Sequence, residues 1–113
     1  MNISLLGLGE TTATFEAESR VTVGMPVKMS GDGRVGPCAL KDKFFGVAVN
    51  VRGGYAAVQI SGYARVQYSG TAPAVGYQTL NGAGDGTAQV EATGRSLLVT
   101  DVDTAAKTCG ILL

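Results

Sequence analysis

Cysteine supplies the most reactive side chains in this sequence, at Cys38 and Cys109. A structural zinc site needs four Cys or His ligands, whereas the 113-residue chain has two cysteines and no histidine. The Ser-His and Cys-His nucleophile systems are excluded too, because each needs an imidazole to carry the proton. We therefore expect no catalytic residue, no metal ligand, no cofactor and no enzymatic activity. We expect both cysteines to be reduced and buried as small apolar residues, with a disulfide as the alternative.

Three glycine-rich strings are similar to ligand-binding motifs. Residues 31–36 fit the glycine spacing of dinucleotide-binding loops, but Pro37 follows them and no helical period comes after it, so the helix that would hold a pyrophosphate is missing. Residues 81–86 are similar to a single copy of a calcium-binding repeat that works only in tandem arrays. The Arg-Gly-Gly string at 52–54 is similar to an RNA-binding tripeptide that needs many copies. All three strings are predicted to be hairpin turns.

The charged residues balance over the whole chain but are unevenly distributed along it. Nine bases and nine acids leave no net charge to drive non-specific nucleic-acid binding, so we expect no nucleic-acid partner. No stretch reaches the ~18 apolar residues that span a bilayer, and the first residues carry no base, so we expect neither a membrane contact nor a signal peptide. Residues 1–19 hold three acids and no base, whereas residues 20–52 hold six bases and two acids.

Residues 1–20 combine apolar and acidic side chains without a clear period. We interpret them as an extended N-terminal arm that becomes ordered on a partner, with an edge strand of the domain itself as the alternative. The apolar and acidic residues of this arm are the candidate contacts with a partner or with a neighbouring copy: Leu5, Leu6, Leu8, Phe15, Glu16 and Glu18.

Residues 21–113 are predicted to form a single all-β domain, a compact barrel of short strands and glycine-rich hairpins. The 17 glycines and the many β-branched residues favour strands joined by tight turns, and helix is limited to residues 38–43 and 103–107 at most. Apolar residues alternate over residues 45–52 and again over 58–68, where Gly62 shifts the register and indicates a bulge. This alternation predicts the core residues Phe45, Val47, Val49, Val58, Ile60 and Val66.

An internal repeat is visible within this domain. A Val-Gly pair and a Gly-Asp-Gly string occur at residues 23–33 and again at residues 75–86, with an offset of 52 residues at the first feature and 53 at the second. Each copy predicts a strand, a Gly-Asp-Gly hairpin and a return strand. Two such units packed on each other would give a compact β structure with a pseudo-dyad.

The order of these features resembles that of the small capsid cement, or head decoration, proteins of tailed bacteriophages. The resemblance covers about four fifths of the chain and is carried by the order and spacing of its segments. These segments are residues 23–29 with the Gly-Asp-Gly at 31–33, residues 44–49, residues 58–66, Gly76, and residues 94–113 with their Ile-Leu-Leu end.

This resemblance implies a fold of the β-clip or β-tulip kind and a homotrimer. It also implies binding to the major capsid protein on the outside of the assembled phage head, after synthesis in the host cytoplasm. Residues 1–20 depart from the family pattern, so the mode of attachment is not implied. The competing interpretation is a β-rich adhesion or carbohydrate-binding module, with Tyr55, Tyr63 and Tyr77 as its exposed aromatic residues.

Overall fold

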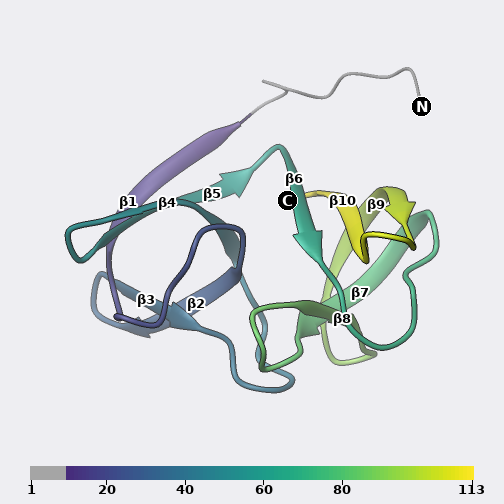
Figure 1. Cartoon of the computed structure of the whole chain (residues 1–113), viewed down its shortest axis with the longest axis horizontal. Helices are drawn as coiled ribbons and strands as arrows, with labels where there is room; N and C mark the ends of the chain where they lie inside the picture. Colours follow the sequence, from purple (N-terminus) through teal and green to yellow (C-terminus); the bar gives the residue numbers. More distant parts are fainter. Residues whose placement is uncertain (1–9) are drawn as a thin grey trace.

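The computed structural model describes residues 10–113, so the predicted contact residues Leu5, Leu6 and Leu8 lie outside the described part. Within that part the chain forms ten β-strands and no helix (Figure 1). The strands are β1 (Thr11–Ala17), β2 (Pro26–Gly31), β3 (Arg34–Pro37), β4 (Gly46–Arg52), β5 (Tyr55–Ser61), β6 (Tyr63–Gln67), β7 (Gly76–Gly82), β8 (Ala88–Val90), β9 (Arg95–Asp103) and β10 (Thr108–Leu112). The predicted all-β class is confirmed.

Five of the strands close into a barrel in the order β1-β3-β2-β4-β5. Neighbouring strands are antiparallel except β1 and β3, which run parallel where Glu16 and Ala17 face Arg34 and Val35. Short side chains fill the interior, because a barrel of so few strands encloses little space. The fully buried ones are Val27, Val35, Ala48, Ala56 and Val58.

The other five strands form a second sheet in the order β6-β10-β9-β7-β8, antiparallel throughout. This sheet curves until its two edges meet. Tyr68, just after β6, forms a parallel bridge with Ala88 of β8, and the Ser69 N–H donates to the Ala88 carbonyl at 2.9 Å. The barrel and the second sheet therefore lie beside each other as two curved units (Figure 1).

Strand β4 and Gly62 connect these two units. In β4, Ala48 belongs to the barrel core, while its neighbour Val47 belongs to the apolar cluster of the second sheet. Gly62 has a φ of 89° and lies between β5 and β6, where the chain leaves the barrel and enters the second sheet. The predicted bulge at Gly62 is thus a change of sheet. The predicted shift of the alternation after Gly62 is confirmed, because Ala64 and Val66 are buried.

Three of the predicted core residues, Val47, Val58 and Val66, are buried. Phe45 and Ile60 are half-buried against the barrel core. The cysteines also behave as predicted, since Cys38 and Cys109 are free and buried in the cluster of the second sheet.

The prediction for Val49 is wrong, because its side chain is 41% exposed. A register shift between Ala48 and Asn50 places an extra residue in β4 opposite β5, so Val49 leaves the alternation that the sequence suggests. Phe44, which was not predicted, is only 2% exposed and packs in the cluster of the second sheet.

No helix forms in the two segments where it was considered, residues 38–43 and 103–107, and both contain turns. In the first, the Ala39 N–H donates to the Asp42 carboxylate at 2.9 Å. In the second, the N–H groups of Ala105 and Ala106 donate to Asp103 Oδ1 at 3.0 and 3.1 Å. An Asp side chain that accepts from nearby backbone N–H groups stabilises a turn in competition with a helix.

The three glycine-rich strings are turns between strands, as predicted. They connect β2 to β3, β4 to β5, and β7 to β8. Each contains glycine with positive φ, at Gly33, Gly53, Gly54, Gly84 and Gly86. The two repeat units are therefore both hairpins, with one in the barrel and one in the second sheet.

Residues 11–17, within the predicted N-terminal arm of residues 1–20, form a strand of the barrel, which is the alternative interpretation of this segment. Strand β1 pairs with β5 from Thr11 to Glu16, and the Phe15 ring packs edge to face on Phe45 with 5.6 Å between the ring centroids. Its inward side chains, Ala13, Phe15 and Ala17, are half-buried, which gives β1 the alternation of a barrel strand.

Candidate interaction surfaces

The first half of β1 has an open edge. The Ala17 N–H donates to the Gly54 carbonyl on the β5 side, whereas the Glu16 N–H donates to the Gly33 carbonyl on the β3 side, each at 2.9 Å. Backbone groups alternate in direction along a strand, so those of Thr12 and Thr14 point to the same side as those of Glu16. Strand β3 pairs with β1 only at Glu16 and Ala17.

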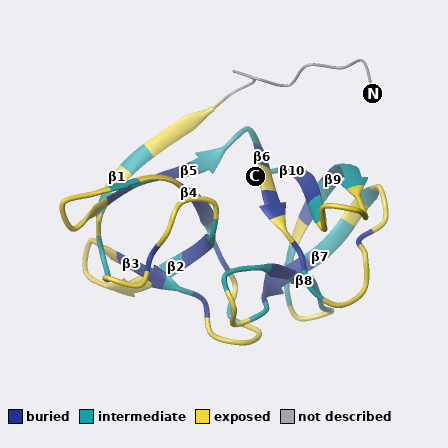
Figure 2. Ribbon diagram, viewed as in Figure 1, coloured by how far each residue is buried: buried dark blue, intermediate teal, exposed yellow. Residues whose placement is uncertain are grey.

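No other described strand pairs with this side of residues 12–14. Figure 1 shows the first half of β1 running away from β3, and Figure 2 shows that it is exposed. Unpaired N–H and C=O groups at a sheet edge are a template for another strand. This edge is therefore a candidate site for an extended segment of a partner.

The predicted contact residues of β1 and its C-terminal extension divide between the barrel and its surface. Phe15 faces the barrel core, and Glu16 lies on the opposite face of the strand. Glu18 pairs with Arg20 at 3.0 Å and covers Gly36, where a Cβ atom would come within 2.0 Å of the Glu18 carboxylate. The hydrogen bond from Arg20 lowers the pKa of Glu18 from its ordinary value. Glu18 is thus engaged within its own chain.

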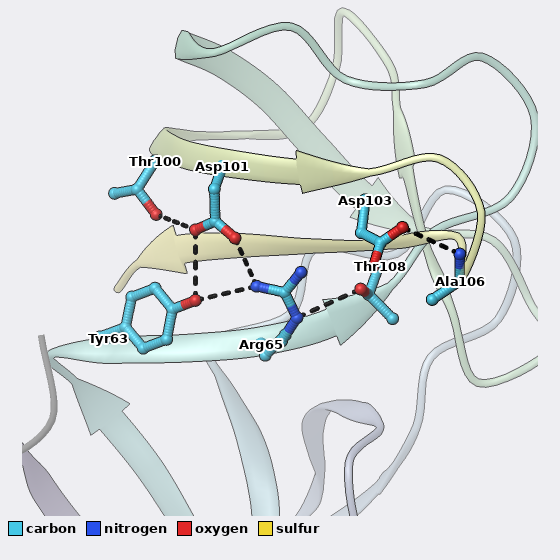
Figure 3. Close-up of polar contacts among 7 residues, drawn as sticks. All are labelled: Tyr63, Arg65, Thr100, Asp101, Asp103, Ala106 and Thr108. Carbon is cyan, nitrogen blue, oxygen red and sulfur yellow. Dashed lines mark hydrogen bonds and ion pairs between the residues drawn. The ribbon is translucent and has the colours of Figure 1, made fainter. Parts of the chain in front are cut away.

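A polar network covers part of the outer face of the second sheet (Figure 3). Arg65 forms an ion pair with Asp101 and donates from Nε to Thr108 Oγ1 at 3.1 Å. The Tyr63 hydroxyl donates to Asp101 Oδ1 at 3.2 Å and accepts from Arg65 Nη1 at 3.0 Å. Thr100 donates to the same carboxylate at 2.7 Å. Residues of three neighbouring strands are thereby fixed to one another.

Gly110 creates the space for this network. A Cβ atom at residue 110 would lie 2.3 Å from Asp101 Oδ1 and 2.5 Å from the Tyr63 hydroxyl oxygen. The hydrogen bond from Arg65 lowers the pKa of Asp101, and the same contact raises the pKa of Arg65. The two charges neutralise each other on this face.

An apolar row crosses the same outer face beside the network. Tyr63 of β6 is opposite Leu112 of β10, Leu112 is opposite Leu98 of β9, and Leu98 is opposite Tyr77 of β7. Directly opposite residues of antiparallel strands project to the same face. Tyr77 is 76% exposed, and the other three are partly exposed. We call these four residues the Tyr-Leu-Leu-Tyr row.

Sequence reasoning missed Leu98, Leu112 and Asp101 as surface residues of interest. The alternation over residues 58–68 that buries Val66 also places Tyr63 and Arg65 on the outer face. The row, however, depends on which strands are neighbours and in what register. Strand order is a non-local property, and no local period of the sequence carries it.

A wide hollow of about 700 Å³ lies between the barrel and the turn after β7. Its wall includes Lys28, which pairs with Asp42, and Glu18 with its partner Arg20. Cys38 also contributes to the wall, but burial raises the pKa of its thiol to about 11, so the nucleophilic thiolate is scarce near neutral pH. Because these charges are paired and the Cys38 thiol is protonated, we assign no catalytic or ligand-binding role to this hollow.

No protein-family model matches the chain, and no curated protein matches it. Across residues 10–113, no group of three metal-ligating side chains gathers into a possible metal site. None of the described chain forms a helix that could cross a bilayer. The candidate interaction surfaces in the described residues are the open edge of β1 and the outer face of the second sheet.

Proposed function

We propose that this chain is a capsid decoration, or cement, protein of a tailed phage. It binds the major capsid protein on the outside of the assembled head as a homotrimer and stabilises the shell. The open edge of β1 is the observation that carries this proposal, because it offers a partner a row of backbone hydrogen bonds. In this role the protein is structural and performs no catalysis.

The attachment combines backbone pairing with apolar burial. An extended segment of the shell protein pairs with Thr12 and Thr14, while Leu5, Leu6 and Leu8 precede this edge in the sequence and supply apolar contact area. Three copies in one trimer hold three such contacts at once, so a modest affinity at each contact gives stable attachment overall.

A proline substitution at the open edge tests this attachment. Thr14→Pro removes the outward N–H of β1 but leaves the hydrogen bonds of its neighbours to β5 in place. We expect the variant to fold, as judged by circular dichroism, but to lose co-sedimentation with undecorated heads of the phage that encodes it. Thr14→Val is the matched control, since it keeps the N–H and should bind as the wild type does.

Thr12→Pro provides a second test at the same edge, in case Pro at residue 14 disturbs the barrel. If both proline variants fold and sediment with heads as well as Thr14→Val does, the edge is not the attachment site. A wild-type protein that does not bind undecorated heads contradicts the proposed function itself.

A carbohydrate-binding module is the less well supported alternative. Tyr63 and Tyr77 share one face of the second sheet, but Tyr55 begins β5 in the barrel. Leu98 and Leu112 fill the space between the two tyrosines and offer no hydrogen bond to a sugar hydroxyl. This geometry favours contact with a protein.

A further inference from the structure

We propose that the Tyr-Leu-Leu-Tyr row is a contact between two copies of this chain, packed face to face about a twofold axis. This contact does not require a phage head and does not use the open edge of β1. It is separate from the threefold contact of the proposed homotrimer, so the two contacts together give six copies, and the twofold contact alone gives two.

The order of residues in the row makes it self-complementary. The row reads Tyr63, Leu112, Leu98, Tyr77 across four adjacent strands, and it has the same order of residue types from either end. A twofold axis along the strands, between β9 and β10, places each tyrosine against a tyrosine of the second copy and each leucine against a leucine. A twofold contact needs a single patch that fits itself, and this row meets that condition.

Charge also favours a second copy as the occupant. Arg65 and Asp101, which lie beside the row, neutralise each other and are hydrogen-bonded to Tyr63 and Thr108. In a face-to-face contact Arg65 and Asp101 are buried as a pair, whereas a lone charge would be costly to bury. The whole chain has a net charge of zero, so two copies approach each other without net repulsion.

The Tyr77 end of the row is exposed, while Tyr63, Leu98 and Leu112 are half-buried, so part of its apolar area is available. Tyr77 is 76% exposed, and the neighbouring Val75 is 69% exposed. On the inner side of the same strands, Ile111 and Val99 are fully buried. Two tyrosines and two leucines brought together on the outer face of a sheet are typical of the centre of a protein contact, where aromatic residues contribute most.

Sedimentation of purified protein at micromolar concentration tests this proposal. We expect the wild type to sediment with an even number of copies, and Tyr77→Ser and Leu98→Ser to sediment with half that mass or with a dissociation constant raised at least tenfold. Tyr55→Ser is the matched control, since it removes a tyrosine that is 54% exposed on the barrel and should leave the mass unchanged. Circular dichroism checks that each variant is folded.

Three results would overturn the proposal. The first is a mass that neither row variant changes, which includes a wild type that is already monomeric at the highest concentration. The second is a trimer that Tyr77→Ser converts to monomer, which would assign the row to a threefold contact. The third is a monomer whose migration in a native gel is retarded by a soluble β-glucan through Tyr77, which would assign this face to sugar binding.

Discussion

Asp101 is the residue through which pH should act on the outer face of the second sheet. Its pKa is lowered by the hydrogen bond from Arg65, so the folded state favours the carboxylate more than the unfolded state does. A group of this kind adds stability above its ordinary pKa of 3.8, and this contribution is lost as the pH falls through the lower folded value.

We therefore expect Asp101→Asn to be less stable than the wild type in urea unfolding at pH 7, and the difference to shrink at pH 3. Because the pair is partly exposed, the effect at pH 7 should be modest. Asp32→Asn, in the exposed turn after β2, is the control and should change stability little at either pH. A difference between Asp101→Asn and the wild type that stays constant from pH 7 to pH 3 contradicts the role assigned to the carboxylate.

Phe44 and Phe45 are adjacent in sequence but make unequal contributions to the core. Phe44 is 2% exposed in the cluster of the second sheet, whereas Phe45 is half-buried beside Phe15. Truncation of a buried Phe to Ala costs about 3–5 kcal/mol. We expect Phe44→Ala to lose stability in this range and Phe45→Ala to lose less, as measured by denaturant unfolding. The reverse order would contradict the burial assigned to these two side chains.

The alternation of single strands was predictable from the sequence where no irregularity interrupts it. Residues 64–68 alternate as expected, and the Gly-Asp-Gly turns are where the sequence predicts them. Val49 could not be placed in the same way, because a bulge depends on how β4 pairs with β5. The turns at Asp42 and Asp103 depend on side-chain hydrogen bonds that compete with helix formation.

Strand β1, which was only the alternative interpretation of its segment, did carry a local signal. Ala13, Phe15 and Ala17 alternate with Thr12, Thr14 and Glu16, which is the period of a half-buried strand. The small size of alanine and the charge of glutamate weakened this pattern. The apolar and acidic character of residues 1–20 taken together then favoured an arm.

Truncation at two positions tests the assignment of β1 to the barrel. Removal of residues 1–18 takes away a strand that pairs with both β3 and β5, so we expect the barrel to open and cooperative unfolding to be lost. Removal of residues 1–9 spares every barrel strand, so we expect its melting temperature to stay close to that of the full chain. A folded 19–113 fragment with the melting temperature of the full chain would show that β1 is dispensable.

At the scale of the whole molecule, the all-β class could be predicted, but the division into two sheets could not. The chain passes through β1 to β5 in the barrel and then through β6 to β10 in the second sheet, with Gly62 between them. Composition and alternation do not determine strand order. For this reason the open edge of β1 and the Tyr-Leu-Leu-Tyr row both emerge only from the three-dimensional structure.

The pairing of β1 with β5 also sets the order in which the barrel can form during synthesis. Strand β1 ends at residue 17, and its partner β5 starts at residue 55, so β1 emerges first and must wait for a distant strand. At about 5–20 residues per second, synthesis of the intervening ~40 residues takes roughly 2–8 s, while the β2–β3 hairpin can form in microseconds. Throughout this interval the edge of β1 that faces β5 is unpaired. Before β5 is synthesised, the outward face of β1 is polar because it carries Thr12, Thr14 and Glu16. This polarity limits aggregation of the strand on the ribosome.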